Sequence, residues 1–362
     1  MPTATKVKIH NFSAGPCILP QEVFQKAAES VLDFEGSGLS ILEMSHRSKP
    51  FEAVMLKARE LVKELLGAPA NYQTVFLGGG ASMGFHLVPQ NFMKPGGKGA
   101  YVNTGEWAKR AIKEAKLAGA AEVVASSEDR NFNYIPKGFT IPSDADYFHF
   151  TSNNTIFGTQ YKQFPKSPVP MICDMSSDIF SRPVNVADFA MIYAGAQKNM
   201  GPAGLCVVIV RDDLVGHART STPSIFDYAQ MAASDSMLNT PPTFSVYLLG
   251  LILEWVQSLG GLEAMAVRNS AKATRLYSFI DESGFYSNPV ALDSRSWMNV
   301  PFVTARPDLD KTFVAEATAA GLTNLAGHRS VGGMRASIYN AMPIEGVEAL
   351  IDFMADFERR NA

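Results

Sequence analysis

Short apolar runs that end in glycine-rich or polar loops recur through the first two-thirds of the chain, and a segment with helical periodicity follows the first two of them. Repeated strand–loop–helix units predict a mostly parallel sheet covered by helices, with ligands bound at the carboxyl ends of the strands. The segments are Tyr72–Phe92, Gly99–Ala120, Asp146–Gln160 and Val169–Val184, followed by two buried strands at Phe189–Ala194 and Leu205–Val210.

Two N-terminal segments have clear helical periodicity. Asn11–Phe34 passes from a Gly-Pro turn into a helix that begins near Pro20. Its expected apolar stripe comprises Val23, Phe24, Ala27, Ala28, Val31 and Leu32. Met44–Gly67 opens with polar residues and continues as a long amphipathic helix that ends at Gly67.

The last third of the chain predicts a small α/β domain after a break at Gly260 and Gly261. Helices are expected at Phe244–Leu259 and Leu262–Ser283, then a strand at 296–303, a helix at 309–322, a strand at 333–340 and a helix at 347–360. We therefore expect an N-terminal arm (1–15) associated with the small domain, a large cofactor-binding domain (16–260) and a small C-terminal domain (261–362).

The composition is that of an ordinary globular protein, since 46% of the 362 residues are hydrophobic and 19% are charged. The net charge of −3 indicates no nucleic-acid or membrane-surface partner. Cys17, Cys173 and Cys206 lie far apart, which argues against a disulfide framework and a CxxC metal site. The N-terminus has no signal-peptide core, and no window approaches the ~18 apolar residues of a membrane span, so we expect a cytoplasmic protein.

One lysine, Lys198, lies in the glycine-rich loop between the two buried strands, within AGAQKNMGPAG. Asp174 ends the preceding short strand, where a buried acid is costly without a partner. An ordinary loop lysine is the alternative, but a lysine held at a strand end beside an acid suits reaction with a carbonyl. Our hypothesis is a Schiff-base lysine.

Further candidates follow the other strands. The N–H groups after Gly78–Gly80, at Ala81 and Ser82, form a natural anion site at a helix start, although a plain tight turn is the alternative. Trp107 opens the next helix, either as core packing or as a lid stacked on a flat ring. Thr155 lies in a polar loop after the third strand.

Two clusters of cations are candidates for anion recognition. His46 and Arg47 lie at the non-helical entrance of the long helix, where solvated surface is the usual role. His328, Arg329 and Arg335 share a glycine-rich turn, which suits a carboxylate or a phosphate, and a solvated basic turn is the alternative.

A lysine of near-neutral pKa, an acid, a stacking aromatic ring and an amide-rich phosphate site are what a protein supplies for pyridoxal 5′-phosphate (PLP) chemistry. Lys198 would bind the cofactor and move the substrate's α-proton, Asp174 would pair with the pyridine nitrogen, and Trp107 would stack on the ring. The phosphate would be held by Gly80, Ala81 and Gln197. No metal is needed.

The chain also resembles the phosphoserine aminotransferases, which are class V PLP enzymes of fold type I. The motifs are NFSAGP, MSHRSK, GGGASMGF, DMSSDIFSRPV, AGAQKNMGPAG, NTPPTF and GHRSVGGMRASIYNAMP, in collinear order from Asn11 onward. The resemblance implies a large domain with a mostly parallel sheet between helices and a smaller C-terminal α/β domain. It implies amino transfer between glutamate and 3-phosphohydroxypyruvate in serine biosynthesis, and leaves open the related phosphorylated keto acid of vitamin B6 (pyridoxine) biosynthesis.

Carried over residue by residue, the resemblance supports the roles of Lys198, Asp174 and Trp107 and adds others. Thr155 would contact the hydroxyl side of the cofactor. The phosphate ligands would be Gly80, Ala81 and Gln197, with Asn239 and Thr240 reaching across from the other subunit of a homodimer. Arg335 would hold the α-carboxylate, and the substrate phosphate or the glutamate side chain would meet His46, Arg47, His328 and Arg329. Ala81 and the loop SNNTIFG depart from the usual pattern.

Three alternatives differ in chemistry. A cysteine desulfurase needs a mobile, exposed cysteine, and none lies in an obviously flexible loop. Alanine–glyoxylate transamination would leave the cluster around Arg47, His328 and Arg329 without an anion. A catalytically silent cofactor-binding or scaffold protein would keep the fold but would not need to keep Lys198, Asp174 and Arg335 together.

Overall fold

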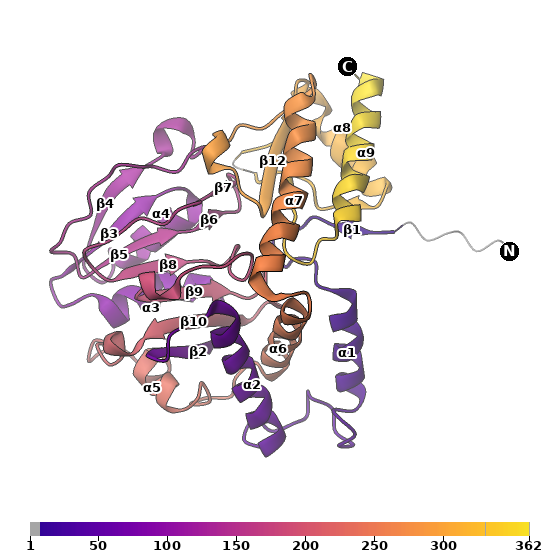
Figure 1. Ribbon diagram of the computed structural model, residues 1–362. Helices are drawn as coiled ribbons and strands as arrows, with labels where there is room; N and C mark the ends of the chain where they lie inside the picture. Colours follow the sequence, from indigo (N-terminus) through magenta and orange to yellow (C-terminus); the bar gives the residue numbers. More distant parts are fainter. Residues whose placement is uncertain (1–7, 330, 362) are drawn as a thin grey trace.

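A seven-stranded sheet forms the centre of the first two-thirds of the chain in the computed structural model, which describes residues 8–329 and 331–361 (Figure 1). Its order is β2-β10-β9-β8-β5-β3-β4, and only β10 runs antiparallel to its neighbours. The strands are β2 (Tyr72–Gly78), β3 (Lys98–Asn103), β4 (Ala120–Ser126), β5 (Tyr147–Thr151), β8 (Met171–Asp174), β9 (Met191–Gly195) and β10 (Leu205–Arg211). The mostly parallel sheet is confirmed, whereas the pattern did not predict β4, whose residues are largely exposed or half-buried.

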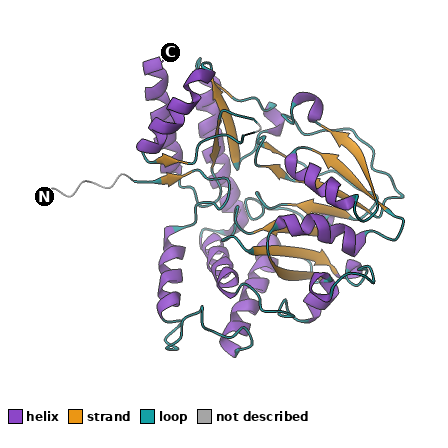
Figure 2. Ribbon diagram, turned by 180° about the vertical axis from the view of Figure 1, so that it is seen from behind, coloured by secondary structure: helices purple, strands orange, loops and turns teal. Residues whose placement is uncertain are grey.

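Helices cover both faces of this sheet, as Figure 2 shows from behind. Successive strand residues point to opposite faces, so Val207 belongs to one core and Val208 to the other. The first core includes α2 (Lys49–Leu66) and α6 (Thr243–Ser258); the second includes α3 (Ala81–Phe92), α4 (Glu106–Ala115) and α5 (Tyr228–Ala233). The sheet is thereby buried on both faces except at its edge strand β4, and its strand ends position the loops that carry the candidate residues.

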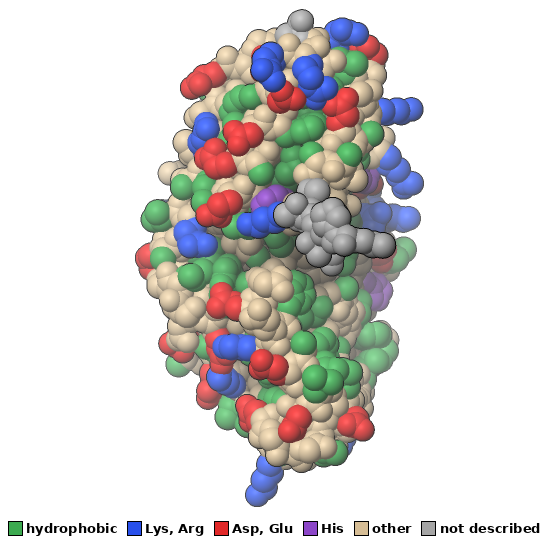
Figure 3. Space-filling model, turned by 90° about the vertical axis from the view of Figure 1, so that its right-hand side faces the viewer, with side chains coloured by type: hydrophobic (Ala, Val, Ile, Leu, Met, Phe, Trp, Pro, Cys, Tyr) green, Lys and Arg blue, Asp and Glu red, His purple; other side chains and the backbone are tan. Residues whose placement is uncertain are grey.

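The apolar stripe expected on α1 (Gln21–Leu32) is wrong in part. Val23 and Ala27 are buried, but Phe24 is 45% and Leu32 is 84% exposed. Figure 3 shows hydrophobic side chains over the lower part of the face that α1 forms. Within one chain, α1 therefore keeps apolar surface that its own core does not cover.

The C-terminal third packs around a second sheet and a separate core, which also takes Phe12 from the N-terminal segment. Its elements are α7 (Gly261–Glu282), β11 (Tyr286–Ser287), β12 (Asn299–Thr304), α8 (Asp310–Ala319), β13 (Leu322–Thr323), β14 (Met334–Ser337) and α9 (Ile344–Asn361). β1 (His10–Asn11) pairs with β13, and a short ribbon joins β6 (Asn153–Asn154) to β7 (Thr159–Gln160). The domain boundaries stay a prediction, and the first seven residues of the expected arm lie outside the described residues.

Lys272 of α7 is 3% exposed and stabilises the segment that follows β14 through hydrogen bonds to its backbone. Its Nζ donates hydrogen bonds to the carbonyls of Ile338 (3.0 Å), Tyr339 (2.7 Å) and Met342 (3.0 Å). Lys272→Met would remove these three hydrogen bonds, while the Tyr339 carbonyl would keep the one from Met342 N, so we expect the free energy of unfolding to fall by roughly 2–4 kcal/mol. Denaturant unfolding measures this loss; an unchanged midpoint, like that expected for the exposed Lys311→Met, would contradict it.

Candidate active site

Lys198 lies at the carboxyl edge of the central sheet, in the loop between β9 and β10. β9 runs parallel to β8, whose last residue is Asp174, and Asp174 pairs with Tyr193 in the register of the two strands. Parallel strands end at the same edge of a sheet, so the lysine loop and the acid come together there. The expected strand-end positions of both residues are confirmed.

The surroundings of Lys198 favour its neutral amine. Burial lowers the pKa of Lys198, Asp174 opposes that shift by favouring the ammonium, and Arg335 lowers the pKa further. The net direction is downward, which raises the fraction of the nucleophilic form near neutral pH.

Asp174 is only 3% exposed, and one of its oxygens is already engaged. Oδ1 accepts hydrogen bonds from Ser176 N (3.0 Å) and Ser176 Oγ (2.5 Å). Among the described residues Oδ2 accepts none. Burial raises the pKa of Asp174, while Lys198 and the hydrogen bonds from Ser176 lower it. The carboxylate thus has one fixed oxygen and one that is available to a ligand.

Trp107, Thr155 and Arg335 form a second group around the lysine. The Trp107 ring centroid lies 4.7 Å from Lys198 Nζ, and its Nε1 donates a hydrogen bond to Thr155 Oγ1 at 3.0 Å. Arg335 Nη1, from β14, donates to the Thr155 carbonyl at 3.1 Å. Thr155 therefore links the Trp107 ring of α4 to Arg335 of the C-terminal third through two hydrogen bonds.

The glycine loop and Gln197 meet at the N-terminus of α3. A Cβ on Gly195 would lie 2.7 Å from Gln197 Oε1 and 3.1 Å from Ala81 N, so only glycine fits there without a shift. Gln197 Oε1 is buried without a hydrogen-bond partner, and the first N–H groups of a helix have none within it. The arrangement suits an anion at the start of α3.

Sequence reasoning assigned no role to the segment around Gly15, although it noted the motif NFSAGP. A Cβ on Gly15 would lie 3.4 Å from Lys198 Cγ, and Cys17 N donates to the Gln197 carbonyl at 3.0 Å. Tyr339 Oη donates to the Ala14 carbonyl at 2.7 Å. The N-terminal segment thus forms one wall of the site.

A model of the class V aminotransferases matches residues 9–350. The chain belongs to this family. It is 54% identical to a phosphoserine aminotransferase of Flavobacterium johnsoniae, covering 98% of this chain and all of that protein. It is 53% identical to a phosphoserine aminotransferase of Listeria monocytogenes, covering 97% of this chain and 96% of that protein.

Solved class V structures show the same architecture. The phosphoserine aminotransferase of Bacillus circulans subsp. alkalophilus superposes with a TM-score of 0.96 at 46% identity, covering 98% of this chain and 99% of that one. A PLP-bound phosphoserine aminotransferase from Trichomonas vaginalis superposes with a TM-score of 0.92 at 37% identity, covering 96% of this chain and 100% of that one. The resemblance to this group and the expected fold are confirmed. An alanine–glyoxylate aminotransferase from Nostoc sp., at 14% identity, shares the fold alone.

The C-terminal cations reach the site unequally. Burial lowers the pKa of His328, and the neighbouring Arg335 and Arg329 lower it further. Arg335 Nε is buried without a hydrogen-bond partner, whereas Arg329 is exposed. Arg335 is therefore placed next to Trp107 and Lys198 through Thr155, with His328 within electrostatic range.

The chain does not bring four expected residues to Lys198. Arg47 is exposed and makes only a local hydrogen bond, from its N to Ser45 Oγ at 3.2 Å. His46 Nε2 is buried without a hydrogen-bond partner, and Asn239 and Thr240 are exposed. None of the four makes a hydrogen bond or an ion pair with the described residues around Lys198. Their roles stay predictions.

Proposed function

We infer that this class V aminotransferase uses PLP to move an amino group between L-glutamate and 3-phosphohydroxypyruvate, yielding 2-oxoglutarate and O-phospho-L-serine. The observation that carries this conclusion is the meeting of Lys198, Asp174 and Trp107 at one edge of the sheet, with Arg335 joined to them through Thr155. The relatives described above, which are more than 50% identical to this chain, are named for this activity.

The residues present fit the cofactor. The Gly195 backbone brings Ala81 N, at the N-terminus of α3, close to the Gln197 side chain, whose Nε2 is a donor, and these N–H groups suit a phosphate. The available Asp174 Oδ2 suits a protonated ring nitrogen, and Trp107 offers an aromatic face. Lys198 would hold the group through Nζ, with Gly80 at the phosphate end. When bound, PLP supplies an electron-accepting ring for amino transfer.

The chain's own residues supply the proton transfer and the orientation. Lys198 Nζ has a lowered pKa and can accept the α-proton of the amino acid and return it to the keto acid. Asp174, held by Ser176, provides a fixed negative charge, and Trp107 covers the lysine. Arg335 directs its guanidinium to this space and would bind the α-carboxylate.

The cations at 328–335 support a substrate that carries a second anionic group. With glutamate as donor, we expect 3-phosphohydroxypyruvate to be aminated with a kcat/KM at least about 10-fold above that of hydroxypyruvate, because a hydrogen bond to a charged group contributes ~1.5–3 kcal/mol. Measuring phosphoserine and 2-oxoglutarate formed from each keto acid tests this. Equal kcat/KM values for the two acceptors would show that no phosphate site exists.

The rival chemistries are less well supported. Cys173 and Cys206 are buried, and burial raises the pKa of the half-buried Cys17 to about 12, so no reactive thiolate for desulfuration is found among the described residues. Alanine–glyoxylate exchange would use neither His328 nor Arg329. Use of the phosphorylated keto acid of vitamin B6 biosynthesis stays open.

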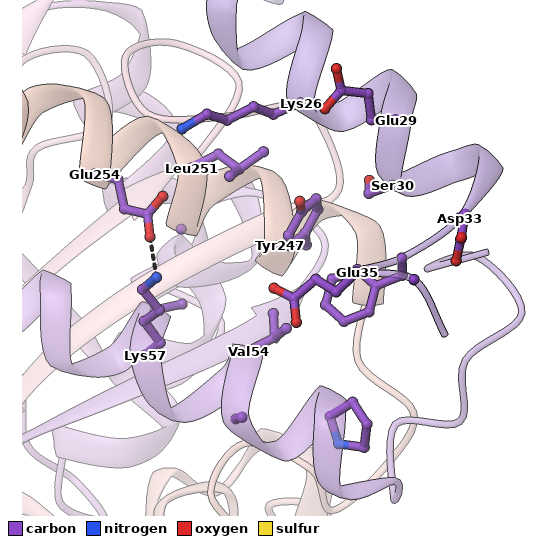
Figure 4. A pocket seen from close by; sticks show the side chains of 16 residues that line it. Lys26, Glu29, Ser30, Asp33, Glu35, Val54, Lys57, Tyr247, Leu251 and Glu254 are labelled. Carbon is purple, nitrogen blue, oxygen red and sulfur yellow. Dashed lines mark ion pairs between the residues drawn. The ribbon is translucent and has the colours of Figure 1, made fainter. Parts of the chain in front are cut away.

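We propose that the active protein is a homodimer with shared sites. The support is an apolar face beside His46 and Arg47: Leu39 is 49% and Leu42 is 58% exposed, and Leu56 of α2 is 54% exposed. The same region holds a pocket of about 520 Å³ between α1, α2 and α6, where Glu254 pairs with Lys57 (Figure 4). A hollowed, partly apolar face suits a second copy of the chain.

Leu42→Glu would place a charge on this face and should weaken the dimer, as measured by sedimentation. The control is Val267→Glu, at an exposed position of α7, which should leave the dimer unchanged.

Subunit mixing tests the sharing of sites directly. Arg47→Ala and Lys198→Ala proteins, each impaired alone, should regain roughly a quarter of wild-type activity after joint refolding, because half of the dimers are hybrids and each keeps one intact site. The control mixes Lys198→Ala with Asp174→Asn, which belong to one chain's site and should regain nothing. Absence of recovery in the first mixture would place Arg47 in its own chain's site, and full activity of Arg47→Ala alone would place it outside both sites.

No single helix among the described residues is both long and apolar enough to cross a membrane. Within residues 8–329 and 331–361, one pair of helices, α6 and α7 with an 83° bend between them, meets that length and composition when taken together. A cytoplasmic location stays a prediction.

A further inference from the structure

The hydroxyl of Ser176 lies between Asp174 and the end of β9. Ser176 Oγ donates to Asp174 Oδ1 at 2.5 Å and accepts a hydrogen bond from Gly195 N at 3.1 Å. The side chain is 2% exposed, so both hydrogen bonds are shielded from water. One hydroxyl therefore connects the end of β8 with the end of β9, three residues before Lys198.

These contacts restrain the carboxylate. Oδ1 receives two donors from Ser176, the backbone N and the hydroxyl, and the carboxylate plane can no longer turn without breaking one of them. Oδ2 receives no hydrogen bond from the described residues. Gly195 in turn approaches Gln197 and Ala81 N, so the same hydroxyl also holds the backbone at the expected phosphate end.

We propose that Ser176 is a positioning residue that fixes the Asp174 carboxylate against β9, favours its ionised form and leaves Oδ2 available to a ring nitrogen. This inference rests on the proposed use of PLP and deepens it. It assigns to a neutral side chain, which acts through Asp174, the control of the charge that makes the site selective for a protonated ring. Hydrogen bonds to the charged form of a carboxylate favour that form, which gives the physical reason.

Ser177 provides a matched control. It is also 2% exposed, and its Oγ likewise makes two hydrogen bonds, accepting from Asn153 Nδ2 (2.8 Å) and donating to the Asn153 carbonyl (2.9 Å). Neither bond involves Asp174 or Gly195. If both buried serines had only a structural role, Ser176→Ala and Ser177→Ala should affect cofactor binding similarly. The proposal instead predicts that only Ser176→Ala changes the interaction of Asp174 with the ring nitrogen.

The test compares the affinity of the cofactor-free protein for PLP and for 1-deazapyridoxal 5′-phosphate, in which a CH replaces the ring nitrogen. The ratio of the two dissociation constants reports the contact between Asp174 and the ring nitrogen. Ser176→Ala should reduce the preference for PLP by roughly 10- to 100-fold, the range for a hydrogen bond to a charged group. Ser177→Ala should leave it unchanged.

The pH dependence of the same ratio gives a second readout. As Asp174 is protonated, the preference for PLP disappears, and loss of the Ser176 hydroxyl should move that midpoint to higher pH because a hydrogen bond that lowers the pKa is gone. Ser176→Cys, nearly equal in size and a weaker donor, should shift it in the same direction by less. An unchanged ratio and midpoint in Ser176→Ala and Ser176→Cys, or an equal change in Ser177→Ala, would overturn the proposal. A wild-type protein that binds neither compound would overturn the proposed function instead.

Discussion

Lys198→Ala is expected to lower kcat with glutamate and 3-phosphohydroxypyruvate by at least about 10⁴-fold, because one amine serves as both nucleophile and proton carrier. The structure supports both tasks: the loop after β9 places Nζ beside Asp174, and burial lowers the pKa of the amine. The measurement is steady-state and single-turnover amino transfer with PLP in excess. The variant should also lack the absorbance of cofactor bound to lysine.

The matched control is Lys162→Ala. Burial lowers the pKa of Lys162 to about 7, with a further contribution from Arg182, yet its Nζ donates to Gln160 Oε1 at 3.2 Å, away from the site described above. This variant should keep activity within about threefold of wild type, as expected for a residue outside the chemistry. A comparable loss of activity in Lys162→Ala and Lys198→Ala would contradict a specific role of Lys198, because the effect would then follow from losing any buried lysine with a lowered pKa.

Asp174→Asn is expected to lower kcat by roughly 10²- to 10³-fold, the size of one preorganised electrostatic interaction. Asparagine keeps the shape but supplies no negative charge to a protonated ring nitrogen. Since burial raises the pKa of Asp174, activity of the wild-type protein should fall as the pH falls through that pKa, and this acid limb should be absent from the variant.

Asp178→Asn is the control for Asp174→Asn, because it removes a buried carboxylate without removing the charge that is expected to face the cofactor ring. Asp178 is also buried, and its pKa is also raised by burial, but its carboxylate accepts hydrogen bonds from Ser152 Oγ and Gln160 Nε2. We expect lower stability with an unchanged preference for PLP over its deaza analogue. If Asp174→Asn behaved like this control, Asp174 would be a structural acid.

The sheet and its strand-end residues could be predicted because they depend on local pattern. A strand that is buried on both faces is a continuous apolar run, and the residues after it must lie at the sheet edge, so the sequence alone predicts the positions of Asp174 and Lys198. Trp107 and Thr155 followed from the same rule. Their mutual contact, with Nε1 donating to Oγ1, could not, because rotamers and distances between separate loops depend on tertiary packing.

Other features depend on contacts between distant segments. Gly15 lies against Lys198, 183 positions away, through packing that no periodicity encodes. On α1, the pattern treats any apolar residue at helical spacing as core, so it cannot distinguish Val23, which is buried, from Leu32, which a single chain leaves exposed. Ser176 was missed because a small polar residue beside an acid is common, and only the hydrogen bond from Gly195 N reveals its position.

The central claim is that Lys198, and no other lysine, carries the cofactor. Borohydride reduction of the PLP-loaded protein, followed by peptide mapping, tests it most directly, because reduction makes a lysine–cofactor linkage permanent. We predict one pyridoxyl group per chain, on the peptide that contains Lys198, and none on that peptide in Lys198→Ala. A label on another lysine alone, or no stable label at all, would contradict the account.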